Sequence, residues 1–231
     1  MTRRIILLLL LLLALTASAQ KRAVSILGDS YSTYKNFVCP DTNAVWYPNK
    51  PLQGNEGNDV QNVRQTWWHQ FISKGNFRLC RNNSFSGATI CNTGYNGEDY
   101  SDRSYVTRSP FLDSPEVIIV FGGTNDSWAK SPVGEYKYCD WNEHDLYSFR
   151  PAMACMLSSL QDRYPGAEIY VVINSGLTKD IEESQKVISD HYGVRWIQLH
   201  DIDKQWGHPS QAGMKAIAQQ VMNFVKKDLE K

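Results

Sequence analysis

The sequence lacks an excess of either charge, and this absence limits the partners to be considered. Lys and Arg together number 24, Asp and Glu together also number 24, and no run of basic residues occurs. Nucleic acids and anionic membrane surfaces attract clustered positive charge, so neither is expected as a partner. Cys-x-x-Cys pairs and His-rich stretches are also absent, so no metal site is expected.

Long apolar runs are missing except at the amino terminus. There, Arg3-Arg4 precedes an unbroken apolar run from Ile5 to Leu15, and Ala17-Ser18-Ala19 follows it. This run is shorter than the roughly 20 residues that a membrane-spanning helix needs. The pattern predicts a signal peptide at residues 1–19, cleaved after Ala19, and a single domain at residues 20–231. We therefore expect an exported protein, periplasmic or extracellular, with no membrane segment after cleavage.

Cysteine is scarce, and its odd count means that at least one thiol is unpaired. Cys155 lies on an apolar helix face and is expected to be a buried thiol. The other four lie in or beside loop-like stretches, where an oxidising compartment would allow one or two disulfides of undetermined pairing. These four are Cys39, Cys80, Cys91 and Cys139.

The rest of the chain alternates short β-branched runs with amphipathic helical segments. Strands are expected at residues 24–27, 77–81, 117–121, 169–173 and 195–199, and helices at 61–74, 147–164, 179–191 and from Pro209 onward, with Gly75 and His208 at helix boundaries. This alternation predicts an α/β fold with a central parallel sheet and helices on both faces. Residues 31–59, with Trp46 and Tyr47, form a long irregular segment. It is expected to be either a wall or lid over the site at Ser30, or a surface loop pinned by a disulfide of Cys39.

Four polar clusters follow strands or loops and contain Ser30, Gly87, Asn125 and His208. Acyl transfer needs a nucleophile, a base and hydrogen-bond donors for the developing oxyanion. Ser30 would attack the carbonyl, and His208 would act as base and then as acid. The backbone N–H groups of Ser30 and Gly87 and the side-chain amide of Asn125 would form the oxyanion hole.

These clusters, taken in order, resemble the motifs of the SGNH hydrolases, also called the GDSL esterase/lipase family. The matching blocks are Gly28-Asp29-Ser30, the segment 83–87 ending in Gly87, Gly123-Thr124-Asn125-Asp126 and His208-Pro209. The resemblance implies a three-layer α/β/α sandwich of flavodoxin-like type, ester hydrolysis through an acyl-enzyme, and no cofactor. The Gly-x-Ser-x-Gly elbow of the α/β-hydrolases is absent.

One position departs from the family pattern. The family usually has an aspartate three residues before the catalytic histidine, and here that position is Gln205. Either Asp203 orients His208 through a differently shaped loop, or a backbone carbonyl near Gln205 does so and the enzyme works as a dyad. We favour Asp203 over the more distant Asp201. His200 is kept as a spare candidate near a strand end.

Aromatic residues in the segment after Asn125 suggest the substrate, because Trp and Tyr faces stack on sugar rings. This segment contains Trp128, Tyr136, Tyr138 and Trp141. We expect hydrolysis of an O-acetyl group on a carbohydrate, although the same rings could serve only for packing. The alternatives are a lipid esterase or thioesterase of the same fold and a non-catalytic carbohydrate-binding module. Asp126 is expected to brace its loop rather than act on substrate.

Overall fold

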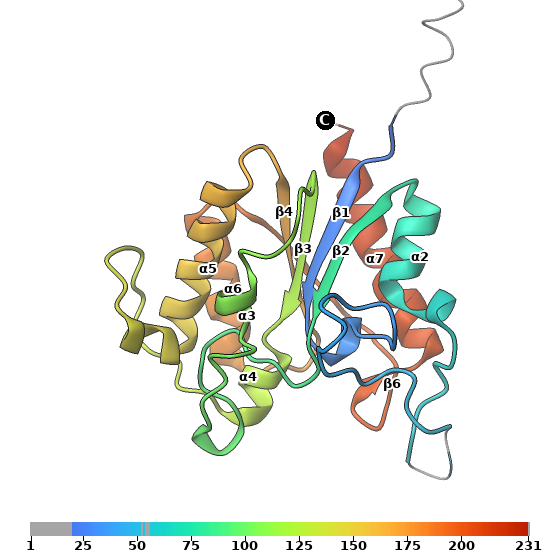
Figure 1. The fold of residues 1–231 in the computed structure, drawn as a ribbon, viewed down its shortest axis with the longest axis horizontal. Coiled ribbons are helices and arrows are strands. Elements are labelled where there is room, and N and C mark those ends of the chain that lie inside the picture. The colour runs from blue at the N-terminus through green and yellow to red at the C-terminus, as the bar shows by residue number, and fades with distance from the viewer. Residues whose placement is uncertain (1–19, 52, 54–55, 231) are drawn as a thin grey trace, which may run out of the picture.

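The computed structural model describes residues 20–51, 53 and 56–230, so the predicted signal peptide lies outside the described residues. Its centre is a five-stranded parallel sheet with the order β2-β1-β3-β4-β5 (Figure 1). The strands are β1 (Ala23–Gly28), β2 (Arg78–Ser84), β3 (Val117–Gly122), β4 (Glu168–Ile173) and β5 (Arg195–Gln198). β1 and β3 are buried along their whole length, as expected of central strands covered on both faces.

Helices cover both faces of this sheet, which confirms the predicted three-layer fold. Helices α2 (Trp67–Gly75) and α7 (Gln211–Leu229) pack on one face, and α3 (Tyr105–Arg108), α5 (Phe149–Arg163) and α6 (Lys179–His191) pack on the other (Figure 1). Alternate side chains of β3 point into the two cores. Ile119 packs with α2 and α7, whereas Ile118 packs with α5 and α6.

Shorter elements lie in the connections. They are α4 (Thr124–Ala129) and the 3₁₀ turns η1 (Ser30–Ser32), η2 (Val63–Gln65), η3 (Tyr95–Gly97) and η4 (Glu143–Tyr147). The segment expected as one helix over residues 61–74 is η2 followed by α2. The side chain of Thr66 accepts a hydrogen bond from the N–H of His69 and starts the new helix there. Gly75 is the last helical residue, and Asn76 ends the helix in a left-handed conformation.

Two further boundaries differ from expectation. β2 continues through Ser84, so the polar residues 82–84 belong to the strand rather than to the loop after it. Pro209 does not start the last helix. Instead, β6 (Lys204–Gln205) and β7 (His208–Pro209) form a small antiparallel hairpin, and Ser210 caps α7.

The cysteines differ in part from expectation as well. All five thiols are free, Cys91 is the buried one, and Cys155 is half-buried. None of the helices within residues 20–230 combines the length and apolar character needed to cross a bilayer.

Candidate active site

Three of the predicted residues meet because their strands are neighbours. Ser30 follows β1, Gly87 follows β2 and Asn125 follows β3, and β1 lies between the other two strands. All three strands run parallel, so the three residues lie at the carboxyl ends of the strands. Here the strand order reverses, because β1 is followed by β2 on one side and β3 by β4 on the other. Ligand sites of doubly wound α/β folds form at this kind of position.

Ser30 and His208 are in contact, as the sequence predicts. The Oγ of Ser30 lies 3.0 Å from Nε2 of His208, and both side chains are almost fully buried. The turn before Ser30 is tight: a Cβ on Gly28 would lie 2.6 Å from Ser32 Cβ and from Ser84 Oγ. The turn that carries Ser30 therefore depends on a glycine at position 28.

His208 is oriented by a backbone carbonyl. Its Nδ1 lies 3.1 Å from the main-chain oxygen of Trp206. A carbonyl can only accept, so Nδ1 carries the proton and Nε2 is free to accept the proton of Ser30. Trp206 and Gly207 have φ of 51° and 74° and form the two-residue turn of the β6–β7 hairpin. Two positive φ values are the mark of a type I′ turn.

The preference for Asp203 as the orienting group is therefore wrong, and its stated alternative describes the structure. The carboxylate of Asp203 accepts a hydrogen bond from the Ser210 hydroxyl, and its main-chain oxygen accepts one from the Ser210 N–H at 3.1 Å. Asp203 thus holds the start of α7. Asp201 and His200 pair with each other at 3.0 Å on the exposed surface, so His200 is not a spare base.

Asn125 is held at both ends of its amide. Its Nδ2 donates to the carbonyl of Ala88 at 2.9 Å, and its Oδ1 accepts from the hydroxyl of Tyr95 at 2.8 Å. One amide hydrogen is left for a ligand. Within the described residues, the N–H groups of Ser30 and Gly87 also have no protein acceptor. Tyr95 was not predicted, because it lies in an irregular loop without a recognisable motif.

Buried charged groups brace the loops around the site. The carboxylate of Asp126 accepts from the N–H groups of Ile90, at 2.9 and 3.0 Å, and of Cys91, at 3.3 Å, which confirms its predicted bracing role. The guanidinium of Arg108, which was not predicted, donates to the carbonyl of Gly28 at 3.2 Å and to that of Asn83. Burial raises the pKa of Asp29 to about 7 and that of Asp126 to about 6.

The described part of the long segment 31–59 forms a wall of the site, which was one of its predicted roles. The indole of Trp46 stacks on the imidazole of His208 with ring centroids 3.8 Å apart and planes 8° apart. Tyr47 donates its hydroxyl hydrogen to the carbonyl of Pro209 at 2.8 Å, and Asn58 donates to the same oxygen at 3.1 Å. Side chains of this segment, and not a disulfide of Cys39, attach it to the β6–β7 hairpin.

The environment of His208 keeps its imidazole neutral. Burial lowers the pKa of His208 to about 4, and the nearby ammonium group of Lys204 acts in the same direction. The hydrogen bond to the Trp206 carbonyl opposes both effects only in part. A neutral imidazole is the form that can accept a proton from serine.

Two tryptophans near Ser30 and His208, in the chain or in space, are exposed. Trp128 and Trp206 are 43% and 50% exposed, and the ring of Trp128 lies 5.9 Å from that of His208. The other aromatic residues of the insertion pack elsewhere. For example, Tyr138 stacks on His191 of α6 at 3.7 Å.

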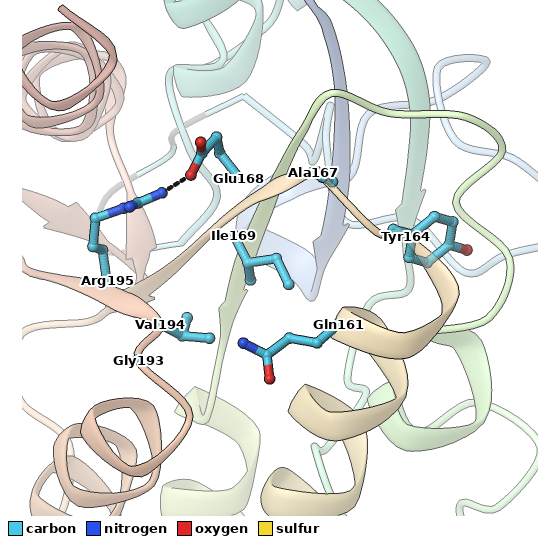
Figure 2. Close-up of a pocket in the computed structure, with 9 residues that line it drawn as sticks. Gln161, Tyr164, Ala167, Glu168, Ile169, Gly193, Val194 and Arg195 are labelled. Carbon is cyan, nitrogen blue, oxygen red and sulfur yellow. Dashed lines mark hydrogen bonds and ion pairs between the residues drawn. The ribbon is translucent and has the colours of Figure 1, made fainter. Parts of the chain in front are cut away.

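A separate cavity of about 270 Å³ lies at the opposite end of the sheet (Figure 2). Glu168 and Arg195, at the amino-terminal ends of β4 and β5, line it and form an ion pair with each other. It shares no residue with the Ser30 site. Across the described chain, no cluster of three or more His, Cys, Asp or Glu side chains is arranged to hold a metal ion.

Comparisons with known proteins agree with this arrangement. A family model described as GDSL-like Lipase/Acylhydrolase matches residues 22–225. A crystal structure of a candidate GDSL-like lipase from Bacteroides ovatus is 55% identical, with a TM-score of 0.86 over 90% of this chain and 99% of that one. A similar candidate lipase from Bacteroides uniformis is 51% identical, with a TM-score of 0.86 over 90% and 96% of the two chains.

A more distant structure shares the fold. A family two carbohydrate esterase from Clostridium thermocellum, solved with cellohexaose, is 16% identical, with a TM-score of 0.63 over 91% of this chain and 65% of that one. The comparison with curated proteins gives no match.

Proposed function

This chain belongs to the GDSL-like lipase/acylhydrolase family, and we propose that it is an exported serine esterase that removes O-acetyl groups from a carbohydrate. The observation that carries the esterase part is the 3.0 Å contact between Ser30 Oγ and His208 Nε2 at the edge of the sheet. Ser30, Gly87 and Asn125 follow neighbouring parallel strands, and this supports the proposal of an oxyanion hole beside the pair.

The reaction follows from this geometry. As Ser30 Oγ attacks the ester carbonyl carbon, its proton passes to His208 Nε2, and the carbonyl oxygen becomes an oxyanion bound by the N–H groups of Ser30 and Gly87 and the amide of Asn125. When the carbon–oxygen bond to the alcohol breaks, His208 returns the proton to the leaving oxygen. Water then attacks the acyl-enzyme by the same proton transfers and releases the acid.

The carbohydrate part is supported by the exposed tryptophans. The ring of Trp128 lies 5.9 Å from that of His208, and the exposed Trp206 is two residues before His208 in the chain. The alcohol portion of the ester would lie beside these residues. Flat aromatic faces bind sugar rings by stacking. Exposed apolar surface of this kind is hydrated unfavourably in the free protein and is typical of binding sites. Export is supported by the signal-like sequence of residues 1–19.

A substrate panel tests this proposal. Acetate release from acetylated xylan, pectin and peptidoglycan fragments is compared with hydrolysis of acetyl, butyryl and longer p-nitrophenyl esters, using Ser30→Ala as the control. We expect acetyl esters to be preferred and at least one acetylated glycan to be hydrolysed. A preference for long acyl chains would favour the lipid esterase. Equal rates for the parent and the Ser30→Ala protein would reject serine catalysis and favour the non-catalytic binding module.

A further inference from the structure

The imidazole of His208 lies flat against one aromatic ring. Trp46 is nearly parallel to it, at 8° and 3.8 Å, whereas Tyr31, Tyr47 and Trp128 meet it at 56° to 82° with centroids 5.4 to 6.3 Å away. Of these four rings, only Trp46 therefore presents its π face to the face of the His208 ring.

Trp46 is also tied to the nucleophile's turn. Its backbone N–H donates to Thr33 Oγ1 at 2.9 Å, and that hydroxyl donates to the carbonyl of Ser30 at 3.0 Å. The ring of Tyr47 packs edge-on against that of Trp46, with centroids 4.5 Å apart, and the Tyr47 hydroxyl donates to the carbonyl of Pro209. The stack thus joins the segment that contains Ser30 to the hairpin that contains His208.

His208 needs a substitute for the missing carboxylate. When it takes the proton of Ser30 it becomes an imidazolium, the charge that an aspartate stabilises in a triad. In the described part of the chain, no acidic side chain forms a hydrogen bond or ion pair with His208. The groups that face it are the Ser30 hydroxyl, the phenols of Tyr31 and Tyr47, whose pKa values burial raises, and the ammonium of Lys204, which disfavours an imidazolium.

We propose that Trp46 is a positioning residue whose indole face stabilises the imidazolium of His208 by cation–π attraction and so replaces part of the contribution of a triad aspartate. This inference rests on the proposed esterase function and adds to it. Indole is the best of the aromatic side chains for cation–π attraction, and the attraction strengthens when the pair is shielded from water. The Trp206 carbonyl holds the ring's Nδ1–H in plane, and Trp46 acts on its face.

Fluorination at position 46 tests the electrostatic part without changing shape. Tryptophans carrying one to four fluorine atoms have progressively less negative charge on the ring face. With p-nitrophenyl acetate, we expect kcat to fall stepwise, by on the order of tenfold in total, while KM stays constant. The NMR pKa of His208 in the resting protein should fall in parallel, because its protonated form loses support. The same series at Trp141, which is remote from His208, is the matched control.

Substitutions give an independent measurement. Trp46→Phe should keep more kcat than Trp46→Leu, although both fill the site with apolar atoms. A loss confined to KM would make Trp46 a substrate platform and overturn the inference, as would kcat and His208 pKa values that do not respond to fluorination. Failure of the unmodified protein to hydrolyse any ester would reject the proposed function instead, and the His208 pKa series would still decide whether the stack stabilises the cation.

Discussion

His208 Nδ1 lies 3.1 Å from the main-chain oxygen of Trp206, a residue two positions earlier with φ of 51°. A bulky residue seldom adopts a left-handed conformation, and such conformations concentrate at functional sites. The tight β6–β7 turn aims the carbonyl back at the imidazole. The group in contact with His208 Nδ1 is thus a main-chain carbonyl, placed by the shape of the hairpin, and not a side chain.

Asp203→Asn should therefore leave catalysis nearly intact. The carbonyl of Trp206 is unchanged by this substitution, so we expect kcat on p-nitrophenyl acetate to stay within about threefold of the parent, against a loss of about 10⁴ when a triad aspartate is neutralised. The free energy of unfolding should drop by about 1 kcal/mol, because the hydrogen bond to Ser210 weakens. Steady-state kinetics and urea unfolding measure both, and a large loss of kcat would restore Asp203 to the triad.

Asn125→Ala should remove a donor that acts on the transition state. We expect kcat to fall by about 10²–10³ with little change in KM. Tyr95→Phe, which removes the hydrogen bond that fixes the amide, should give a smaller loss, about tenfold, with the same signature. Tyr100→Phe, on the neighbouring ring 6.5 Å away, is the control. If Tyr95→Phe lowers only thermal stability, the hydroxyl has no part in orienting Asn125.

The acid limb of the pH profile should lie unusually low. His208 must be neutral to accept the serine proton, and its pKa is lowered to about 4, so the limb of log kcat/KM that reports this histidine should have its midpoint near pH 4. Asp29→Asn should leave this midpoint unchanged, because the decline comes from protonation of His208 and not from titration of the Asp29 carboxyl. A midpoint near the ordinary histidine value of about 6.5 would show that His208 is better solvated than its burial indicates.

Trp206→Asn distinguishes the contribution of the carbonyl of this residue from that of its indole. Asparagine tolerates the left-handed turn and keeps the carbonyl, so kcat on p-nitrophenyl acetate should remain within about threefold of the parent. The exposed indole is lost, and KM for an acetylated oligosaccharide should rise by about tenfold if it stacks on sugar. Equal KM values for the two proteins would show that the Trp206 side chain does not contribute to substrate binding.

The sequence predicted the residues whose position depends on strand ends. Ser30, Gly87 and Asn125 follow neighbouring parallel strands, and a polar residue after a buried run is visible in the sequence. The orienting group could not be predicted in the same way, because every residue has a carbonyl and Trp206-Gly207 does not look like an Asn-Gly hairpin turn. Trp46 and Tyr95 lie in irregular segments, where no periodicity shows which way a side chain points.

The central claim is that Ser30 and His208 form a working dyad without a carboxylate. Rapid mixing of p-nitrophenyl acetate with the parent, Asp203→Asn and His208→Ala proteins, followed by mass spectrometry of their peptides, measures acylation directly. We expect an acetyl group on Ser30 in the parent and, at a similar rate, in Asp203→Asn, and almost none in His208→Ala. An Asp203→Asn protein that acylates as slowly as His208→Ala, or an acetyl group on another residue, would contradict the account.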